Sequence, residues 1–188
     1  MMENKKGFVT LIELLLVIVL ASIVLIFLFQ VYLSHSSLIC SQKAQINVDI
    51  ASRSALDEIG SKLREGKLVL PQAVIGGQTY TTGTQTVVVQ VPSIDSSGIA
   101  IPSLSDILVF INPSGTTQLR EIISPDSSSN RRAMNHILLN NVLSLNFTYN
   151  NADLSQVTSI DIELSSFEVV PRSQKVFSDK ISITLRNK

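Results

Sequence analysis

The stretch from residue 7 to residue 33, GFVTLIELLLVIVLASIVLIFLFQVYL, constrains this chain more than any other part of its sequence. It contains one carboxylate, Glu13, and no charged residue from Leu14 to Phe29. A helix rises about 1.5 Å per residue, so about 20 helical residues cross the roughly 30 Å hydrocarbon core of a bilayer. The stretch therefore predicts one membrane-spanning helix near the N-terminus, with the rest of the chain on one side of the membrane.

Composition limits what this remaining part can be. The chain has 188 residues, and the roughly 150 that remain suffice for one modest domain. Its formal net charge is zero, so the chain has no excess of basic residues that would indicate a nucleic-acid partner. Cys40 is the only cysteine, which rules out an intrachain disulfide. We interpret it as a small residue on a helix, with an intermolecular disulfide as the alternative.

Charges on the two sides of the apolar run predict its orientation. Lys5 and Lys6 precede the run, whereas residues 34–42 after it contain no Asp, Glu, Lys or Arg. The positive-inside rule then predicts a cytoplasmic N-terminus and an extracytoplasmic C-terminal domain. The run is longer than the apolar region of a signal peptide, and no A-x-A-like site follows Leu33. We therefore expect the segment to be retained as a single-pass anchor.

Glu13 is unusual in such a segment, because a carboxylate in hydrocarbon is costly and is expected to be paired or functional. Two interpretations stay open on general grounds. Glu13 lies at headgroup depth, where the positive end of the helix dipole favours an acid, or it serves a specific partner.

The residues around Glu13 resemble a known family. Lys5-Lys6-Gly7-Phe8, followed by Thr10-Leu11-Ile12-Glu13-Leu14-Leu15, is similar to the N-terminus of type IV prepilins and type II secretion pseudopilins. The resemblance implies that a prepilin peptidase cleaves after Gly7 and methylates the new terminus, Phe8. It also implies that Glu13 pairs with the amino terminus of a neighbouring subunit when the helix leaves the lipid and enters a filament. The implied partners are the peptidase, membrane lipid before assembly, and other pilin or pseudopilin subunits.

One residue departs from the family pattern. Val9 is inserted, so Glu13 is the sixth residue after a cut at Gly7, where the family usually has its glutamate fifth. A cut after Phe8 would restore the spacing but would place a bulky residue where the peptidase requires a small one. We favour cleavage after Gly7, and the register between that cut and Glu13 stays open.

A second helical segment is predicted beyond the membrane. No proline occurs before Pro71 and no glycine between Gly7 and Gly60, so nothing interrupts a helix there. Residues 34–66 are predicted to form an amphipathic helix that ends near Gly66 and packs on a sheet. Its apolar stripe is assigned to the following side chains: Leu56, Ile59, Leu63, Ile46 and Ile50.

The remaining residues, 67–188, are predicted to form a β-rich globular domain. Residues 71–105 are predicted to be loop-rich with one strand, Thr86–Val91. Residues 124–133 are predicted to form a polar loop with Arg131 and Arg132 in solvent or, as the alternative, in contact with acidic groups of another subunit. An apolar run ended by a turn signal predicts the strand Asp106–Ile111, with Thr117–Ile123 as its hairpin partner. Alternating apolar residues predict strands at 143–149, 157–164 and 181–186. Short turns favour antiparallel pairing. The predicted fold is α+β, a long N-terminal helix packed on an antiparallel sheet, and this half resembles minor pilins and J-type minor pseudopilins.

No enzymatic constellation is visible in the sequence. It lacks the serine-hydrolase, Walker A, zinc-protease and dinucleotide-binding motifs. The two histidines, His35 and His136, are far apart and lie near no cluster with metal-ligand spacing, so no cofactor, metal or catalytic residue is predicted. We expect a non-enzymatic structural subunit, a minor pilin or pseudopilin, of a bacterial inner-membrane filament system: pilus, pseudopilus or DNA-uptake filament. The alternative is an uncleaved, anchored binding or adhesion module.

Overall fold

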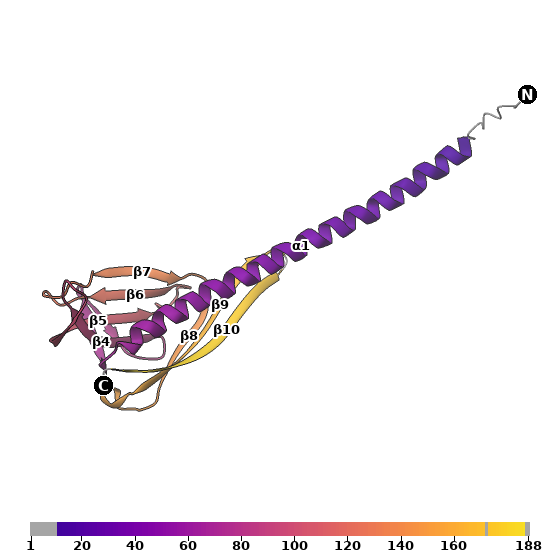
Figure 1. Ribbon diagram of the computed structural model, residues 1–188. Coiled ribbons are helices and arrows are strands. Elements are labelled where there is room, and N and C mark those ends of the chain that lie inside the picture. The colour runs from indigo at the N-terminus through magenta and orange to yellow at the C-terminus, as the bar shows by residue number, and fades with distance from the viewer. Residues whose placement is uncertain (1–10, 172, 187–188) are drawn as a thin grey trace, which may run out of the picture. The chain divides into compact units, whose positions relative to one another are not determined.

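A computed structural model describes residues 11–171 and 173–186 (Figure 1). The chain divides into two compact units between Lys43 and Ala44. Helix α1 (Leu11–Arg64) begins in the first unit, and its last part belongs to the second. The predicted leader, residues 1–7, and the first residues of the predicted helix, 8–10, lie outside the described residues. The elements after α1 are β1 Leu68–Val69, β2 Gln72–Ile75, β3 Gln78–Thr81, β4 Thr86–Ile94, β5 Ala100–Ile111, β6 Leu119–Ser124, β7 Met134–Leu139, β8 Val142–Tyr149, the 3-10 helix η1 Leu154–Gln156, β9 Ser159–Val170 and β10 Ser173–Thr184.

Helix α1 ends close to the predicted stop. Lys62 and Arg64 lie in its last turn, where cations interact favourably with the negative end of the helix dipole. The Gly66 N–H then donates to the Leu63 carbonyl at 2.9 Å. A Cβ on Gly66 would lie 2.8 Å from both that carbonyl oxygen and Val89 Cγ1 of β4. Glycine therefore allows the chain to leave the helix directly against the sheet.

Three antiparallel sheets follow the helix. The larger one has the strand order β1-β4-β5-β6-β7, a second has the order β10-β9-β8, and β2 and β3 form a hairpin of their own. The strand pairs of all three sheets are antiparallel, as the short turns predicted. The chain thus has the predicted α+β fold, with a long N-terminal helix packed on an antiparallel β-sheet domain.

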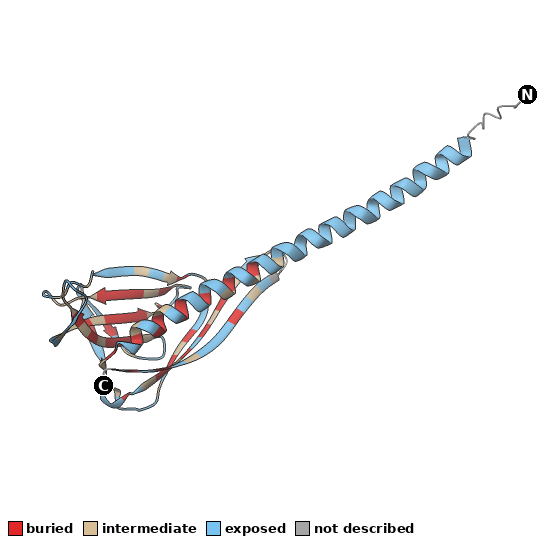
Figure 2. Ribbon diagram, in the orientation of Figure 1, coloured by how far each residue is buried: buried red, intermediate tan, exposed pale blue. Residues whose placement is uncertain are grey.

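The main core lies between the last turns of α1 and the two larger sheets (Figure 2). Leu56, Ile59 and Leu63 on the helix are almost completely buried there. The alternating side chains of several strands supply the other side of this core: Val87, Val89, Leu108, Phe110, Leu119, Phe147, Ile160, Ile162, Leu164 and Ile183.

A smaller core covers the opposite face of the five-stranded sheet. Val88, Val109 and Ile122 point to that face and pack with Ala73 and Tyr80 of the β2–β3 hairpin. Strand β4 is therefore buried on both faces, which explains its run of consecutive valines.

The hairpin corrects the prediction that residues 71–105 are mainly loop. Besides β2 and β3, this region contains a β4 that continues to Ile94 and a β5 that begins at Ala100. The glycines that suggested a loop form the hairpin turn, since Gly76 and Gly77 have φ angles of 59° and 83°. Positive φ at both central residues is typical of the tight turn that joins two twisted strands.

The predicted apolar stripe of the second helical segment is wrong at two positions. Ile46 and Ile50 are 55% and 63% exposed. The buried positions before Leu56 are the smaller Ala44, Val48, Ser52 and Ala55. Small side chains let the helix approach the sheet closely, and Ser52 Oγ lies 2.5 Å from Ser166 Oγ of β9.

Candidate functional site

The first candidate site is the apolar segment, defined here as Leu11–Leu33 of α1. Every side chain in it is classed as exposed (Figure 2). Among the described residues, α1 is the single helix long and apolar enough to cross a membrane. A helix that is apolar on all sides belongs in lipid or inside a larger protein assembly.

The polar residues of the apolar segment fit such surroundings. Glu13 lies in the first turn of α1, where the helix dipole favours a carboxylate. Ser22 donates its hydroxyl to the Ile18 carbonyl at 2.8 Å, which satisfies the donor within the helix. The other predicted site residues, Lys5, Lys6, Gly7 and Phe8, lie outside the described residues, so the cleavage and methylation site stays a prediction.

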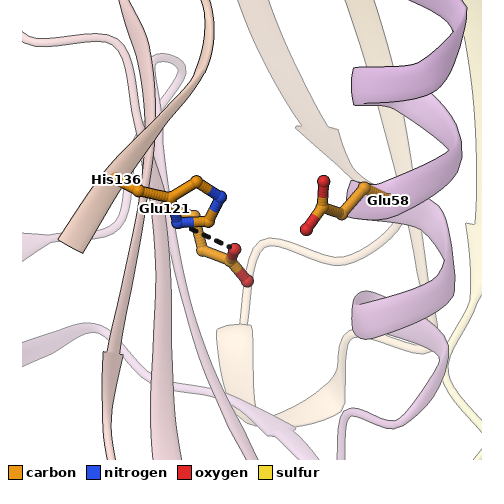
Figure 3. A group of neighbouring side chains, drawn as sticks. All are labelled: Glu58, Glu121 and His136. Atoms are coloured by element: carbon orange, nitrogen blue, oxygen red, sulfur yellow. Dashed lines mark ion pairs between the residues drawn. The ribbon is translucent and has the colours of Figure 1, made fainter. Parts of the chain in front are cut away.

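The second candidate is a group of four charged or ionisable side chains that we name the Glu121 cluster: Glu58, Lys62, Glu121 and His136. Glu121 on β6 is fully buried, and it lies directly opposite His136 of β7 in the strand register. Glu58 and Lys62 are one helical turn apart on α1. Figure 3 shows Glu58 pointing from the helix toward the strand pair.

Lys62 holds the two carboxylates of the Glu121 cluster together. Its Nζ contacts Glu121 Oε1 and lies 3.0 Å from Glu58 Oε1. On the other side, Glu121 Oε2 lies 3.5 Å from His136 Nδ1. These last two atoms are buried and make no hydrogen bond with any described residue. Buried polar atoms in native proteins usually have partners, so this pair calls for an explanation.

The third candidate is a buried carboxylate, Asp106 on β5. Its Oδ1 accepts from Ser93 Oγ at 2.7 Å and from the Asp126 N–H at 2.9 Å. Its Oδ2 accepts from Ser129 Oγ at 2.8 Å and from Arg131 Nε at 3.0 Å. The prediction that Arg131 lies in solvent is therefore wrong, because its side chain is only 18% exposed and pairs with Asp106.

The environment of Asp106 favours its ionised form. Burial alone would raise the pKa of this carboxyl. The hydrogen bonds from the Asp126 N–H, Ser93, Ser129 and Arg131 outweigh burial and lower the pKa below its ordinary value. Asp106 thus anchors the loop after β6 to the sheet as a carboxylate.

A pattern in the sequence could have revealed both buried acids. Glu121 alternates with Leu119 and Ile123, and Asp106 alternates with Leu108 and Phe110. In each strand the acid occupies a position on the same face as core residues. A carboxylate at an inward position needs a cation or several donors, and this signal was available before the structure.

Comparison of the chain with protein-family models, with curated protein sequences and with solved structures found no match. Any functional conclusion must therefore come from the residues and their arrangement.

Proposed function

We propose that this chain is a structural subunit of the type IV pilin or type II secretion pseudopilin class, held in the membrane by α1 and later assembled into a filament through the same helix. One observation carries the proposal: the environment changes along a single helix. The apolar segment, Leu11–Leu33, is fully exposed, whereas residues from Ala44 onward contribute to the core of the β domain. Such a helix supports both an apolar assembly surface and a folded domain.

Glu13 fits the two successive environments of this proposal. In the membrane, its place in the first turn of α1 puts the carboxylate near the headgroups, where its cost is small. In a filament, the carboxylate would neutralise the amino terminus of a neighbouring subunit. Removal of residues 1–7 would create that amino terminus at Phe8, and Lys5 and Lys6 would keep the leader in the cytoplasm until then.

The single cysteine, which excludes an intrachain disulfide, and the moderate length of the chain favour a minor subunit. The β domain would remain outside the cytoplasmic membrane and face other subunits. The resemblance to minor pilins and J-type minor pseudopilins favours a place among the less abundant subunits of a pilus or pseudopilus.

The mature N-terminus tests this proposal directly. Mass spectrometry of protein extracted from membranes should find N-methyl-Phe8 as the first residue. A Gly7→Leu variant should keep its leader, because the peptidase requires a small residue before the cut. An intact Met1 or Met2 terminus, in cells with an active prepilin peptidase, would contradict the proposal and favour an uncleaved, anchored binding module.

Assembly provides a second test. Glu13→Ala should be processed at Gly7 yet be lost from the sheared filament fraction, which immunoblotting measures against the membrane fraction. Glu3→Ala is the matched control, since it removes a carboxylate from the leader that cleavage discards. Equal incorporation of both variants would show that Glu13 has no role in assembly.

A further inference from the structure

Two atoms of the Glu121 cluster that make no hydrogen bond with any described residue face each other across strands β6 and β7. Glu121 Oε2 and His136 Nδ1 are buried, have no hydrogen-bond partner among the described residues, and lie 3.5 Å apart. The Glu58 carboxylate is the third member, and one potential ligand atom from each of the three residues lies within 4.8 Å of the others (Figure 3). Glu121 is fully buried, and a buried carboxylate oxygen that lacks a partner is costly.

We propose that Glu58, Glu121 and His136 form a Zn²⁺ site that links α1 to strands β6 and β7. This site is independent of filament assembly, since all three residues belong to the unit that begins at Ala44. An imidazole nitrogen together with carboxylate oxygens is a ligand set that suits zinc. Calcium and magnesium prefer sites built from oxygen alone.

The separation of Glu121 Oε2 and His136 Nδ1 fits a zinc ion between them. Zinc binds imidazole nitrogen and carboxylate oxygen at about 2.0–2.1 Å, so a 3.5 Å separation corresponds to a ligand–metal–ligand angle of roughly 117°, near the tetrahedral value. Glu58 can provide the third ligand by a side-chain rotation, because its side chain is 39% exposed and has room to move. Solvent can fill the fourth position, since the His136 side chain is also 35% exposed.

Lys62 supports this arrangement from outside the ligand set. Its ammonium group contacts the Oε1 atoms of Glu58 and Glu121 and leaves Glu121 Oε2 facing His136. Hydrogen bonds of this kind orient ligating carboxylates in metal sites. With a neutral imidazole, two carboxylates and one ammonium sum to a single negative charge, which a divalent cation can compensate.

A proton on His136 is the competing occupant. An imidazolium at His136 would pair with Glu121 and satisfy both atoms without a metal. Zinc binding distinguishes the two possibilities. A metal site binds one Zn²⁺ per chain, whereas a proton shared by His136 and Glu121 leaves no such binding.

The experiment uses the full-length protein in detergent, treated with a chelator and then dialysed, and titrated with ZnCl₂ by isothermal titration calorimetry. All measurements are made in a Cys40→Ser background, because cysteine thiolates bind zinc and the thiol of Cys40 is exposed. We expect one Zn²⁺ per chain and a melting temperature that rises with Zn²⁺ concentration. MgCl₂ at the same concentrations should produce neither effect.

Variants locate the site. His136→Ala and Glu121→Gln should each weaken Zn²⁺ binding by at least about tenfold. His35→Ala is the matched control, since it removes the other histidine, which is exposed on α1, and it should bind like the parent. If Glu121→Gln fails to fold by circular dichroism, His136→Ala still decides, because its partly exposed side chain is removable with less damage to the core.

Two results would overturn the proposal. One is the absence of stoichiometric Zn²⁺ binding to the parent protein, which would leave the proton as the occupant. The other is Zn²⁺ binding that survives His136→Ala and is lost in His35→Ala, which would place the metal on α1 outside the Glu121 cluster.

Discussion

Replacing Arg131 with methionine removes the cation beside the buried carboxylate of Asp106. Arg131 Nε donates to Asp106 Oδ2 at 3.0 Å, and Arg131 Nη2 lies 3.1 Å from Glu65 Oε2. Methionine keeps a long apolar side chain at this position, so the variant mainly tests the loss of charge and of hydrogen bonds. We expect the β domain to fold with a clearly reduced free energy of unfolding.

The size of the loss follows from the contacts of Asp106. Removing one partner of a buried ion pair typically costs about 3–5 kcal/mol, because the other charge is left uncompensated. Asp106 keeps its hydrogen bonds from Ser93, Ser129 and the Asp126 N–H, so we expect the lower end, about 3 kcal/mol. The contact with Glu65 adds at most about 0.5 kcal/mol, because the Glu65 side chain is 50% exposed.

Urea unfolding of the full-length protein in detergent measures this loss, followed by the fluorescence of Tyr80 and Tyr149 in the β domain. Arg132→Met is the matched control, since Arg132 is adjacent in sequence, carries the same charge and is exposed. Its unfolding free energy should change by less than about 0.5 kcal/mol. Equal losses for the two variants, or a loss below about 1 kcal/mol for Arg131→Met, would refute the reasoning.

Four further predictions concern stability in the same assay. Gly60→Ala should stabilise the protein by about 0.5–1 kcal/mol, because its Cβ would meet two isoleucine side chains at ordinary contact distance within a helix. Gly66→Ala should destabilise the protein by about 1–3 kcal/mol, because its Cβ would lie 2.8 Å from the Leu63 carbonyl oxygen and Val89 Cγ1. Similar urea midpoints for Gly60→Ala and Gly66→Ala would contradict the close approach at Gly66. Leu63→Ala should lower the free energy of unfolding by about 2–5 kcal/mol, since Leu63 is fully buried. Ile50→Ala should lower it by less than about 0.5 kcal/mol, since Ile50 is exposed. A larger loss for Ile50→Ala would show that Ile50 belongs to the buried face of the helix after all. The pKa of Asp106 is lowered in the folded state, so its contribution is complete above the unfolded value of about 4 and is lost as pH falls through the lower folded value. The difference in unfolding free energy between the parent and Asp106→Asn should therefore shrink from pH 7 to pH 3, and a constant difference would exclude this linkage.

Much of the fold was predictable because it depends on local pattern. The length and apolarity of residues 8–33 and the absence of helix breakers up to Gly60 predict a single long helix, and α1 runs from Leu11 to Arg64. An apolar run, a turn signal and the alternation of apolar residues predict five later strands that overlap β5, β6, β8, β9 and β10. Where pattern was weak, prediction failed: the polar β2–β3 hairpin was read as loop, and no strand was assigned to β7.

The candidate sites also differ in how far local sequence could predict them. Glu13 could be singled out from the sequence, because a carboxylate inside an apolar run is anomalous wherever the rest of the chain folds. The Glu121 cluster could not be assembled in this way. His136 lies on the unpredicted strand β7, and Glu58 lies on a helix more than fifty residues before Glu121.

The sequence by itself therefore determined the membrane-length helix, the anomalous acid Glu13 and the antiparallel β domain. Helical and strand periodicity are properties of neighbouring residues, so they can be read without knowing the fold. Only the tertiary structure decided which helix face is buried and which side chains meet. Strand register places Glu121 opposite His136, and packing of α1 brings Glu58 and Lys62 to them. Such meetings depend on the pairing of distant segments, which no local pattern specifies.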